Sequence, residues 1–156
     1  MIREAAPIHR ETAGLNRYTA VIAPYALTAT RVLVGVIFLL TGLPKFGGLA
    51  GFTNFVGSLG IPLASVVAPL VATFEVVGGL LLIAGIATRW VSLWFIFEMT
   101  VTTLLVKMPN VGLIAPQGKP GVGAELDLLL LVCALVLLTQ GGGTISVERN
   151  VLKREL

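Results

Sequence analysis

The chain has few of the residues that usually bind metals or form redox centres. It contains one histidine, His9, and one cysteine, Cys133. His9 lies near the N-terminus, which excludes a bis-histidine haem site among the apolar segments and disfavours a histidine metal site. A single cysteine can form neither a CxxC motif nor an internal disulfide. We therefore expect no metal, and no cofactor bound by a motif of the chain's own.

The motifs of common enzyme classes are also missing. Gly118 and Lys119 are followed by Pro120, and the glycine spacing before them does not fit a phosphate-binding loop. No GxSxG nucleophile elbow occurs. The sequence names no catalytic residue and leaves open whether the chain itself is an enzyme.

Charge is scarce as well. Only 12% of the 156 residues are charged and 56% are hydrophobic, with a mean hydropathy of +0.95. Soluble domains carry about 25% charged residues, so this composition predicts an integral membrane protein with the lipid bilayer as its main partner. The isoelectric point of about 9.4 does not indicate nucleic acid, because no basic patch interleaved with aromatic residues occurs.

The apolar residues gather in four segments, which predict membrane helices. We expect an all-α integral membrane protein built as a four-helix antiparallel bundle, with helices near residues 27–46, 66–86, 90–108 and 124–139. The transmembrane domain then covers 27–139, with an N-terminal tail at 1–26 and a C-terminal tail at 140–156.

The distribution of basic residues predicts the orientation of these helices. Four crossings place both tails on one side of the membrane. Of the 11 basic residues, three lie on the opposite side, namely Lys45, Lys107 and Lys119, and the other eight lie on the side of the tails. This asymmetry predicts a multi-pass protein of the cell membrane with both termini in the cytoplasm.

The two loops on the opposite side are long. In residues 47–63, Phe52, Phe55, Val56 and Leu59 recur at helical spacing, which predicts a short interfacial or re-entrant helix between the first two membrane helices. Residues 109–123 are rich in proline and glycine and should be irregular. Together the two loops could cover this end of the bundle as a lid.

Both cations of the first membrane helix lie on one of its faces. Arg31, Gly35, Phe38, Gly42 and Lys45 are spaced by alternating steps of four and three residues. Lipid penalises an unpaired charge by several kcal/mol, so this face should turn toward protein, water or a polar ligand. Its glycines should allow a neighbouring helix to come close.

The apolar segments also contain carboxylates, which need a partner or a proton. Glu75 and Glu98 lie near the middle of the second and third segments, and Glu125 and Asp127 begin the fourth. We expect Lys45 to pair with Glu125 and Arg31 to lie near Glu98 or Glu75. Such pairs often only fix the register of helices, and this alternative stays open. The candidate residues of a ligand or quinone pocket are Arg31, Lys45, Glu75, Glu98 and Glu125.

Several stretches resemble the DoxX family of small membrane proteins. They are the R-x3-G-x2-F-x3-G-x2-K pattern from Arg31 to Lys45, FVGSLGIP at 55–62, FEVVGGLLLIAGIATR at 74–89, GAELDLLLLVCALVLL at 123–138 and GGGTISVER at 141–149. The resemblance implies a four-helix membrane protein that serves as a component of quinone-linked oxidoreductase systems, such as thiosulfate:quinone oxidoreductase or a terminal quinol oxidase. The family's charged positions match Arg31, Lys45, Glu75 and Glu125. Glu98 and Asp127 have no counterpart in that pattern.

Three functions remain in competition. The first is a membrane subunit associated with a quinone-linked oxidoreductase complex, whose polar pocket holds a quinone head group and whose partners supply the electrons. The second is a small-solute or proton-coupled transporter, for which a homo-oligomer could supply a second half. The third is a structural subunit that only supports the assembly of a membrane complex.

Overall fold

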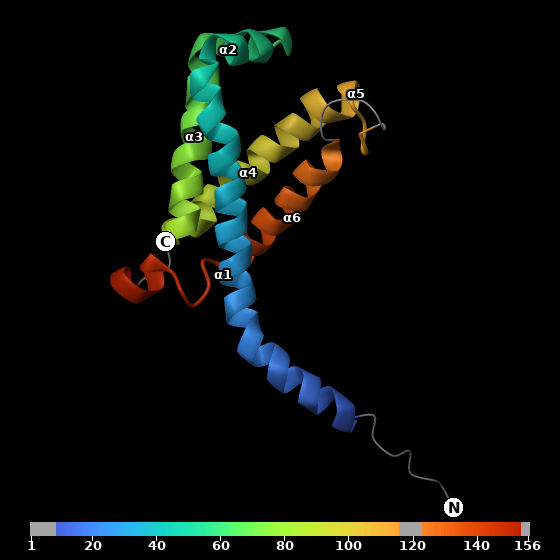
Figure 1. Ribbon diagram of the computed structural model, residues 1–156, viewed down its shortest axis with the longest axis vertical. Helices are drawn as coiled ribbons and strands as arrows, with labels where there is room; N and C mark the ends of the chain where they lie inside the picture. The colour runs from blue at the N-terminus through green and yellow to red at the C-terminus, as the bar shows by residue number, and fades with distance from the viewer. Residues whose placement is uncertain (1–8, 116–122, 154–156) are drawn as a thin grey trace, which may run out of the picture.

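The computed structural model describes residues 9–115 and 123–153, and these residues form helices, turns and loops but no strand. Figure 1 shows the helices in chain order. They are α1 (His9–Gly47), α2 (Leu49–Ser58), α3 (Ala64–Ala84), α4 (Thr88–Thr102), the π-helical turn η1 (Thr103–Lys107), α5 (Met108–Asn110), α6 (Ala124–Gln140) and the π-helical turn η2 (Glu148–Leu152).

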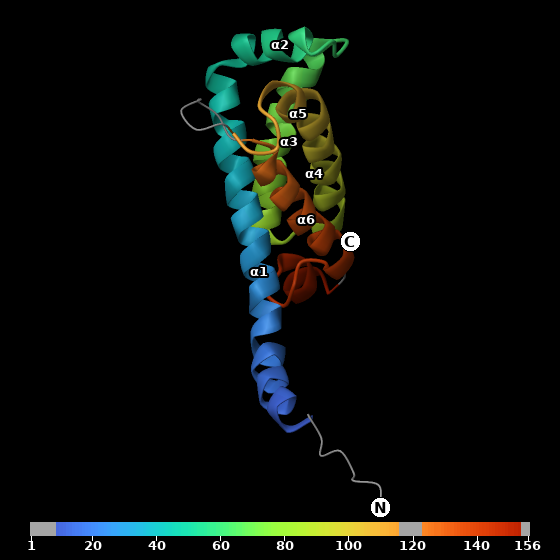
Figure 2. The ribbon, with the colours of Figure 1, turned by 90° about the vertical axis from the view of Figure 1, so that its right-hand side faces the viewer.

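The long helices pack as two pairs. One pair is α1 with α3, and the other is α4 with α6. The pairs meet at the end where α3 turns into α4, and they lean apart toward the end that α2 crosses (Figure 1). Figure 2 shows α2 lying across that end of the molecule. We call this end the α2 end, and the opposite one, where residues 141–152 fold back, the tail end.

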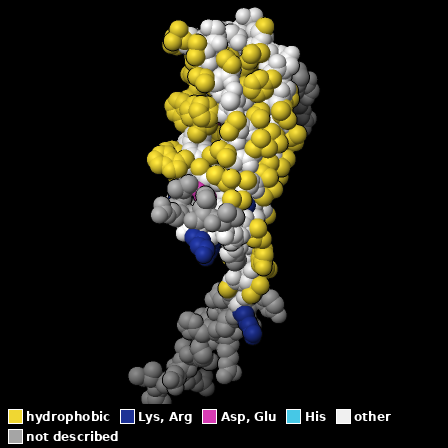
Figure 3. All heavy atoms as spheres, turned by 90° about the vertical axis from the view of Figure 1, so that its left-hand side faces the viewer, with side chains coloured by type: hydrophobic (Ala, Val, Ile, Leu, Met, Phe, Trp, Pro, Cys, Tyr) yellow, Lys and Arg dark blue, Asp and Glu magenta, His cyan; other side chains and the backbone are white. Residues whose placement is uncertain are grey.

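Three stretches are long and apolar enough to cross a membrane. They are Thr19–Gly47, Ala64–Ala84 and Thr88–Asn110, with 29, 21 and 23 residues. The third runs through α4, η1 and α5 without a break. The fourth predicted segment is also helical, but α6 has only 17 residues. The bundle carries many large exposed hydrophobic side chains, and Figure 3 shows them over the upper part of one face.

Glycines bring α1 and α3 into backbone contact, as expected for the glycine face of α1. A Cβ atom placed on Gly79 would lie 2.7 Å from the Gly35 carbonyl oxygen and 2.9 Å from the Leu39 nitrogen. One placed on Gly42 would lie 2.8 Å from Glu75 Cβ. The contacts fix an antiparallel register in which Gly35 faces Gly79 and Gly42 faces Glu75.

The buried core lies between the two pairs, toward the tail end. The rings of Phe38 and Phe95 stack with centroids 3.5 Å apart. Val34 at 2%, and Leu82 and Leu137 at 0% exposure, pack into the same cluster. This Phe38–Phe95 stack seals the space between the pairs on the side of the tail end.

One helix boundary differs from the one expected. Helix α1 begins at His9 and not near residue 27, because residues 9–26 continue the same helix beyond the bundle (Figure 1). The short helix expected between residues 47 and 63 is present as α2. The part of the expected irregular loop at 116–122 lies outside the described residues, and residues 111–115 contain no helix.

Candidate functional site

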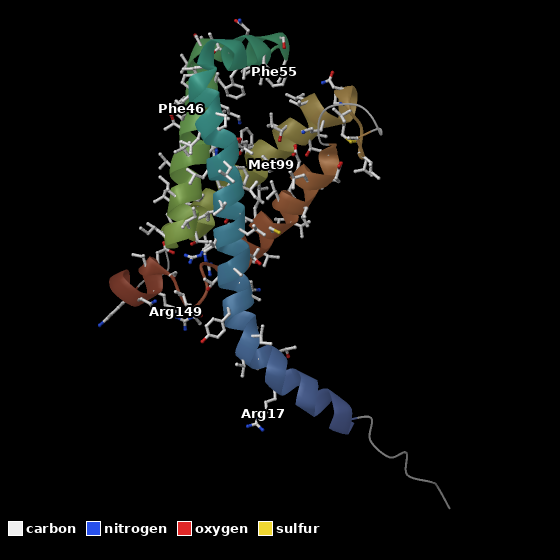
Figure 4. All side chains as sticks on the ribbon, in the orientation of Figure 1. Arg17, Phe46, Phe55, Met99 and Arg149 are labelled. Atoms are coloured by element: carbon white, nitrogen blue, oxygen red, sulfur yellow. The ribbon has the colours of Figure 1, made fainter. Side chains whose placement is uncertain are left out.

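A cavity of about 650 Å³ lies between the two pairs, beneath α2. Its wall is mostly apolar and comes from α1, α2, α3, α4, η1 and α6. Phe55 of α2 and Met99 of α4, both labelled in Figure 4, belong to this wall. The charged side chains in the wall are Lys45, Glu75, Glu98, Lys107 and Asp127.

Lys45 and Glu75 form an ion pair across the first pair of helices. Lys45 Nζ contacts Glu75 Oε2, and the two side chains are 25% and 4% exposed. The pair follows from the register, because Gly42 packs against Glu75 and Lys45 lies one turn further along α1. Lys45 Nζ also lies 4.7 Å from the centroid of the Phe52 ring, a cation–π contact that ties α2 to the pair.

Glu98 brings a second carboxyl group to the same place. Its side chain is 6% exposed, and its Oε2 makes no hydrogen bond to any described residue. The Glu98 carboxyl group interacts electrostatically with Glu75, Lys45 and Trp94. One ammonium group cannot neutralise two carboxylates, and an unpaired buried anion costs several kcal/mol. Glu98 should therefore hold a proton, which makes it a hydrogen-bond donor toward the cavity.

Asp127 is the third buried carboxyl group of the cavity. It is 7% exposed, and its Oδ2 has no hydrogen-bond partner among the described residues. The Asp127 carboxyl group interacts electrostatically with Lys107, Thr102 and Glu125. Asp127 lies in the first turn of α6, so it occupies the α2 end of the cavity.

The predicted pairing of Lys45 with Glu125 is wrong. Lys45 pairs with Glu75, and Glu125 is exposed and is not part of the cavity wall. The physical reason is that α6 packs on α4, and this pair leans away from α1 at the level where Lys45 and Glu125 lie.

The predicted position of Arg31 near Glu98 or Glu75 is also wrong. Arg31 is 2% exposed and lies at the tail end, where its Nη2 donates a hydrogen bond of 2.7 Å to the Ile145 carbonyl oxygen. Arg31 and Lys45 are separated by about 21 Å along α1, at about 1.5 Å per residue, so they cannot serve one site. Arg31 lies beside Gly85, the residue that follows α3, where a Cβ would lie 1.4 Å from Arg31 Nη1.

The partner of Arg31 is a residue of the C-terminal tail that sequence reasoning missed. Glu148 is 2% exposed and attracts Arg31 electrostatically. Its Oε1 accepts a hydrogen bond of 2.6 Å from the Ala87 N–H, and its own N–H donates one of 3.2 Å to the Gly85 carbonyl oxygen. The GGGTISVER stretch was the available signal. Its glycines allow the chain to turn back, with Gly141 and Gly143 at φ of 78° and 79°.

We expect Glu148→Ala to release the tail. The substitution removes a buried hydrogen bond to a charged group, which contributes about 1.5–3 kcal/mol. Trypsin cleavage after Arg149, which is exposed and labelled in Figure 4, should then become faster by about tenfold or more, because cleavage follows the population of the open form. Time courses of proteolysis in detergent measure this, with Glu125→Gln at the other end as the control. Equal cleavage rates would mean that Glu148 does not hold the tail.

The cavity thus brings together Lys45, Glu75 and Glu98 and leaves out Arg31 and Glu125. Sequence reasoning also missed Trp94, which lines the cavity beside Glu98. Its Nε1 is buried, and within the described residues it has no acceptor. A hydrophobic helix offers no signal that distinguishes such a tryptophan from one that faces lipid.

Comparison with known proteins finds one family model and several related proteins from bacteria. The model of the DoxX family matches residues 26–108. A protein named "Putative oxidoreductase CatD" from Bacillus subtilis is 34% identical over 125 residues, which cover 79% of this chain and 84% of that protein. An uncharacterized membrane protein of Mycobacterium tuberculosis is 30% identical over 141 residues, which cover 84% of each chain. The inner membrane protein YphA of Escherichia coli is 32% identical over 82 residues, which cover 53% of this chain and 59% of YphA. No solved structure matches.

Proposed function

Since this chain belongs to the DoxX family of membrane proteins, we propose that it is a membrane subunit of a quinone-linked oxidoreductase and that its cavity holds the quinone head group. The observation that carries the proposal is the buried Glu98 carboxyl group, which lies beside Lys45 and Trp94 in a mostly apolar cavity. The name of the Bacillus subtilis relative, an oxidoreductase, points to the same kind of chemistry.

The cavity suits a quinone in size and in chemistry. Its volume of about 650 Å³ lies within the range of about 300–1,000 Å³ that is usual for ligand pockets. A quinone ring is flat and apolar and carries two carbonyl oxygens that accept hydrogen bonds. Glu98, Lys45 and Trp94 offer donors, and Phe52 and Phe97 offer aromatic surface. A bound quinone would accept two electrons and two protons to become a quinol.

The roles of the residues follow from their positions. Lys45 and Trp94 would orient the ring, and Glu98 would supply a proton to a carbonyl oxygen. The electrons would come from a partner subunit, because the sequence has no redox motif of its own. A long apolar quinone tail would leave the cavity toward the lipid.

We also propose the membrane topology. Helix α6 would cross the bilayer as a fourth helix, since its 17 residues span about 25 Å of a hydrocarbon layer about 30 Å thick. The result is a four-helix antiparallel bundle in the cell membrane, with α2 at the outer interface. The distribution of basic residues supports a cytoplasmic position for the tail end and both termini.

Tryptophan fluorescence tests quinone binding. The chain has two tryptophans, and of these only Trp94 lines the cavity. In a Trp90→Phe background, a short-chain ubiquinone analogue should quench Trp94 in a saturable way. Glu98→Leu removes one hydrogen bond of about 1.4 kcal/mol and should weaken the apparent affinity about tenfold.

The matched control is Glu125→Gln, which changes an exposed carboxylate outside the cavity and should leave the affinity unchanged. Quenching that rises linearly without saturation, or an unchanged affinity in Glu98→Leu, would contradict the proposal.

A further inference from the structure

Two buried carboxyl groups face the same cavity from the two helices of the second pair. Glu98 lies on α4 and Asp127 on α6, and both line the cavity wall. They are 6% and 7% exposed, and Glu98 Oε2 and Asp127 Oδ2 each lack a hydrogen-bond partner within the part of the chain that the structure describes. The proposed chemistry uses only Glu98. Asp127 is thus a buried acid whose presence the quinone site does not explain.

Thr102 lies between the two acids. It follows Glu98 by one turn of α4, its Oγ1 donates a hydrogen bond of 2.9 Å to the backbone carbonyl oxygen of Glu98, and its side chain interacts with the Asp127 carboxyl group. It also lines the cavity. Asp127 faces Lys107 from η1 and Glu125 from its own helix, while Glu98 faces Glu75 and Lys45. The polar groups therefore continue from Glu98 toward the α2 end.

In the other direction the cavity ends at the buried apolar core. The Phe38–Phe95 stack lies between the cavity and the tail end, and its neighbours Val34, Leu82 and Leu137 are buried hydrophobic residues. Arg31 and Glu148 lie beyond this core and do not line the cavity. Asp127 lies in the first turn of α6, on the α2 side of the cavity, and is not part of the Lys45–Glu75 ion pair.

We propose that Asp127 is a proton relay that connects Glu98 to water at the α2 end. When Glu98 gives its proton to the ligand, Asp127 takes a proton from a hydronium ion at the α2 end and passes it through the cavity to the Glu98 carboxylate. Asp127 returns to its starting state, and no electron moves in these steps. The need to return a proton to Glu98 rests on the proposed function, but proton exchange through the relay can be measured without a quinone.

Hydrogen–deuterium exchange of the Glu98 carboxyl group tests the relay. Infrared spectra of the full-length protein in proteoliposomes give the protonated-carboxyl band that Glu98→Gln removes. After transfer to D₂O, this band should shift rapidly in the wild type and more slowly by about tenfold or more in Asp127→Asn, in line with the usual contribution of a positioned acid or base. Thr102→Val should slow the exchange to an intermediate extent. Asp127→Glu, which keeps a carboxyl group, should restore the fast rate.

Glu125→Gln is the matched control, because it removes a carboxylate two residues away on the exposed face of α6. The relay is overturned if Asp127→Asn exchanges as fast as the wild type, if Glu125→Gln slows exchange equally, or if Glu98→Gln removes no band. Should Asp127→Asn fail to fold, Thr102→Val replaces it as the test. Exchange as fast as in the wild type would then overturn the relay, and slower exchange would support it. Since no ligand is present, a negative quenching result with a normal exchange result would refute the quinone site and leave the relay standing.

Discussion

Lys45→Met should lower the free energy of unfolding by about 3 kcal/mol, the lower end of the usual effect of removing one partner of a buried ion pair, because Lys45 is 25% exposed. Glu75 is 4% exposed and would keep a carboxylate without its cation, next to the carboxyl group of Glu98. The cation–π contact with Phe52 would be lost too. Reversible unfolding in mixed micelles, followed by circular dichroism, measures the change.

The double variant Lys45→Met with Glu75→Leu separates the charge effect from packing. Replacing both members of a buried pair by apolar residues is often neutral or stabilising. The double variant should therefore recover most of the stability that Lys45→Met loses. Lys45→Met combined with Glu125→Gln should recover none, because Glu125 is exposed and does not contact Lys45. Recovery with Glu125→Gln but not with Glu75→Leu would instead indicate that Lys45 pairs with Glu125, which the structure contradicts.

Gly79→Leu should destabilise the protein by about 3 kcal/mol or more, because overpacking that cannot relax exceeds the usual range of about 1–3 kcal/mol. The new Cβ would lie 2.7 Å from the Gly35 oxygen and 2.9 Å from the Leu39 nitrogen. These are backbone atoms that cannot rotate away, so α1 and α3 would have to separate. Separation would also break the register that pairs Lys45 with Glu75.

Gly51→Leu is the matched control. The same change is made on α2, where a Cβ would meet no atom within 4 Å. Leucine forms helix better than glycine, by up to about 1 kcal/mol, so this variant should be as stable as the wild type or slightly more stable. A loss in Gly51→Leu equal to that in Gly79→Leu would show that bulk alone, and not helix contact, causes the effect.

Sequence reasoning located the helices because their apolar runs and the glycine face of α1 are local patterns. It predicted the close approach of a neighbour at Gly35 and Gly42 but could not identify the helix. The register between α1 and α3 depends on how far α2 offsets their ends, and the length of a connecting segment does not fix that offset. The sequence alone therefore could not predict which carboxylate pairs with Lys45.

The prediction for the position of Arg31 was wrong for a different reason. Sequence reasoning assumed that the two cations on one face serve one pocket, although a helix separates residues 14 positions apart by about 21 Å. It also treated residues 140–156 as a tail outside the bundle. The buried Glu148 and the left-handed Gly85, with φ of 73°, show that residues 141–152 complete the tail end. Tertiary contacts of this kind leave no periodic trace in a sequence.

The Phe38–Phe95 stack has an energetic consequence for the proposed site. If the α2 end faces outward, as proposed above, protons for the quinone would enter from the outer surface, while electrons from a cytoplasmic donor would arrive from the inner one. Each charge would then move in the direction that an inside-negative membrane potential favours, which contributes about 2.3 kcal/mol per charge and 100 mV for a full crossing. Reduction at this site would thus be electrogenic, and it would run faster in energised membranes while it partly discharges them.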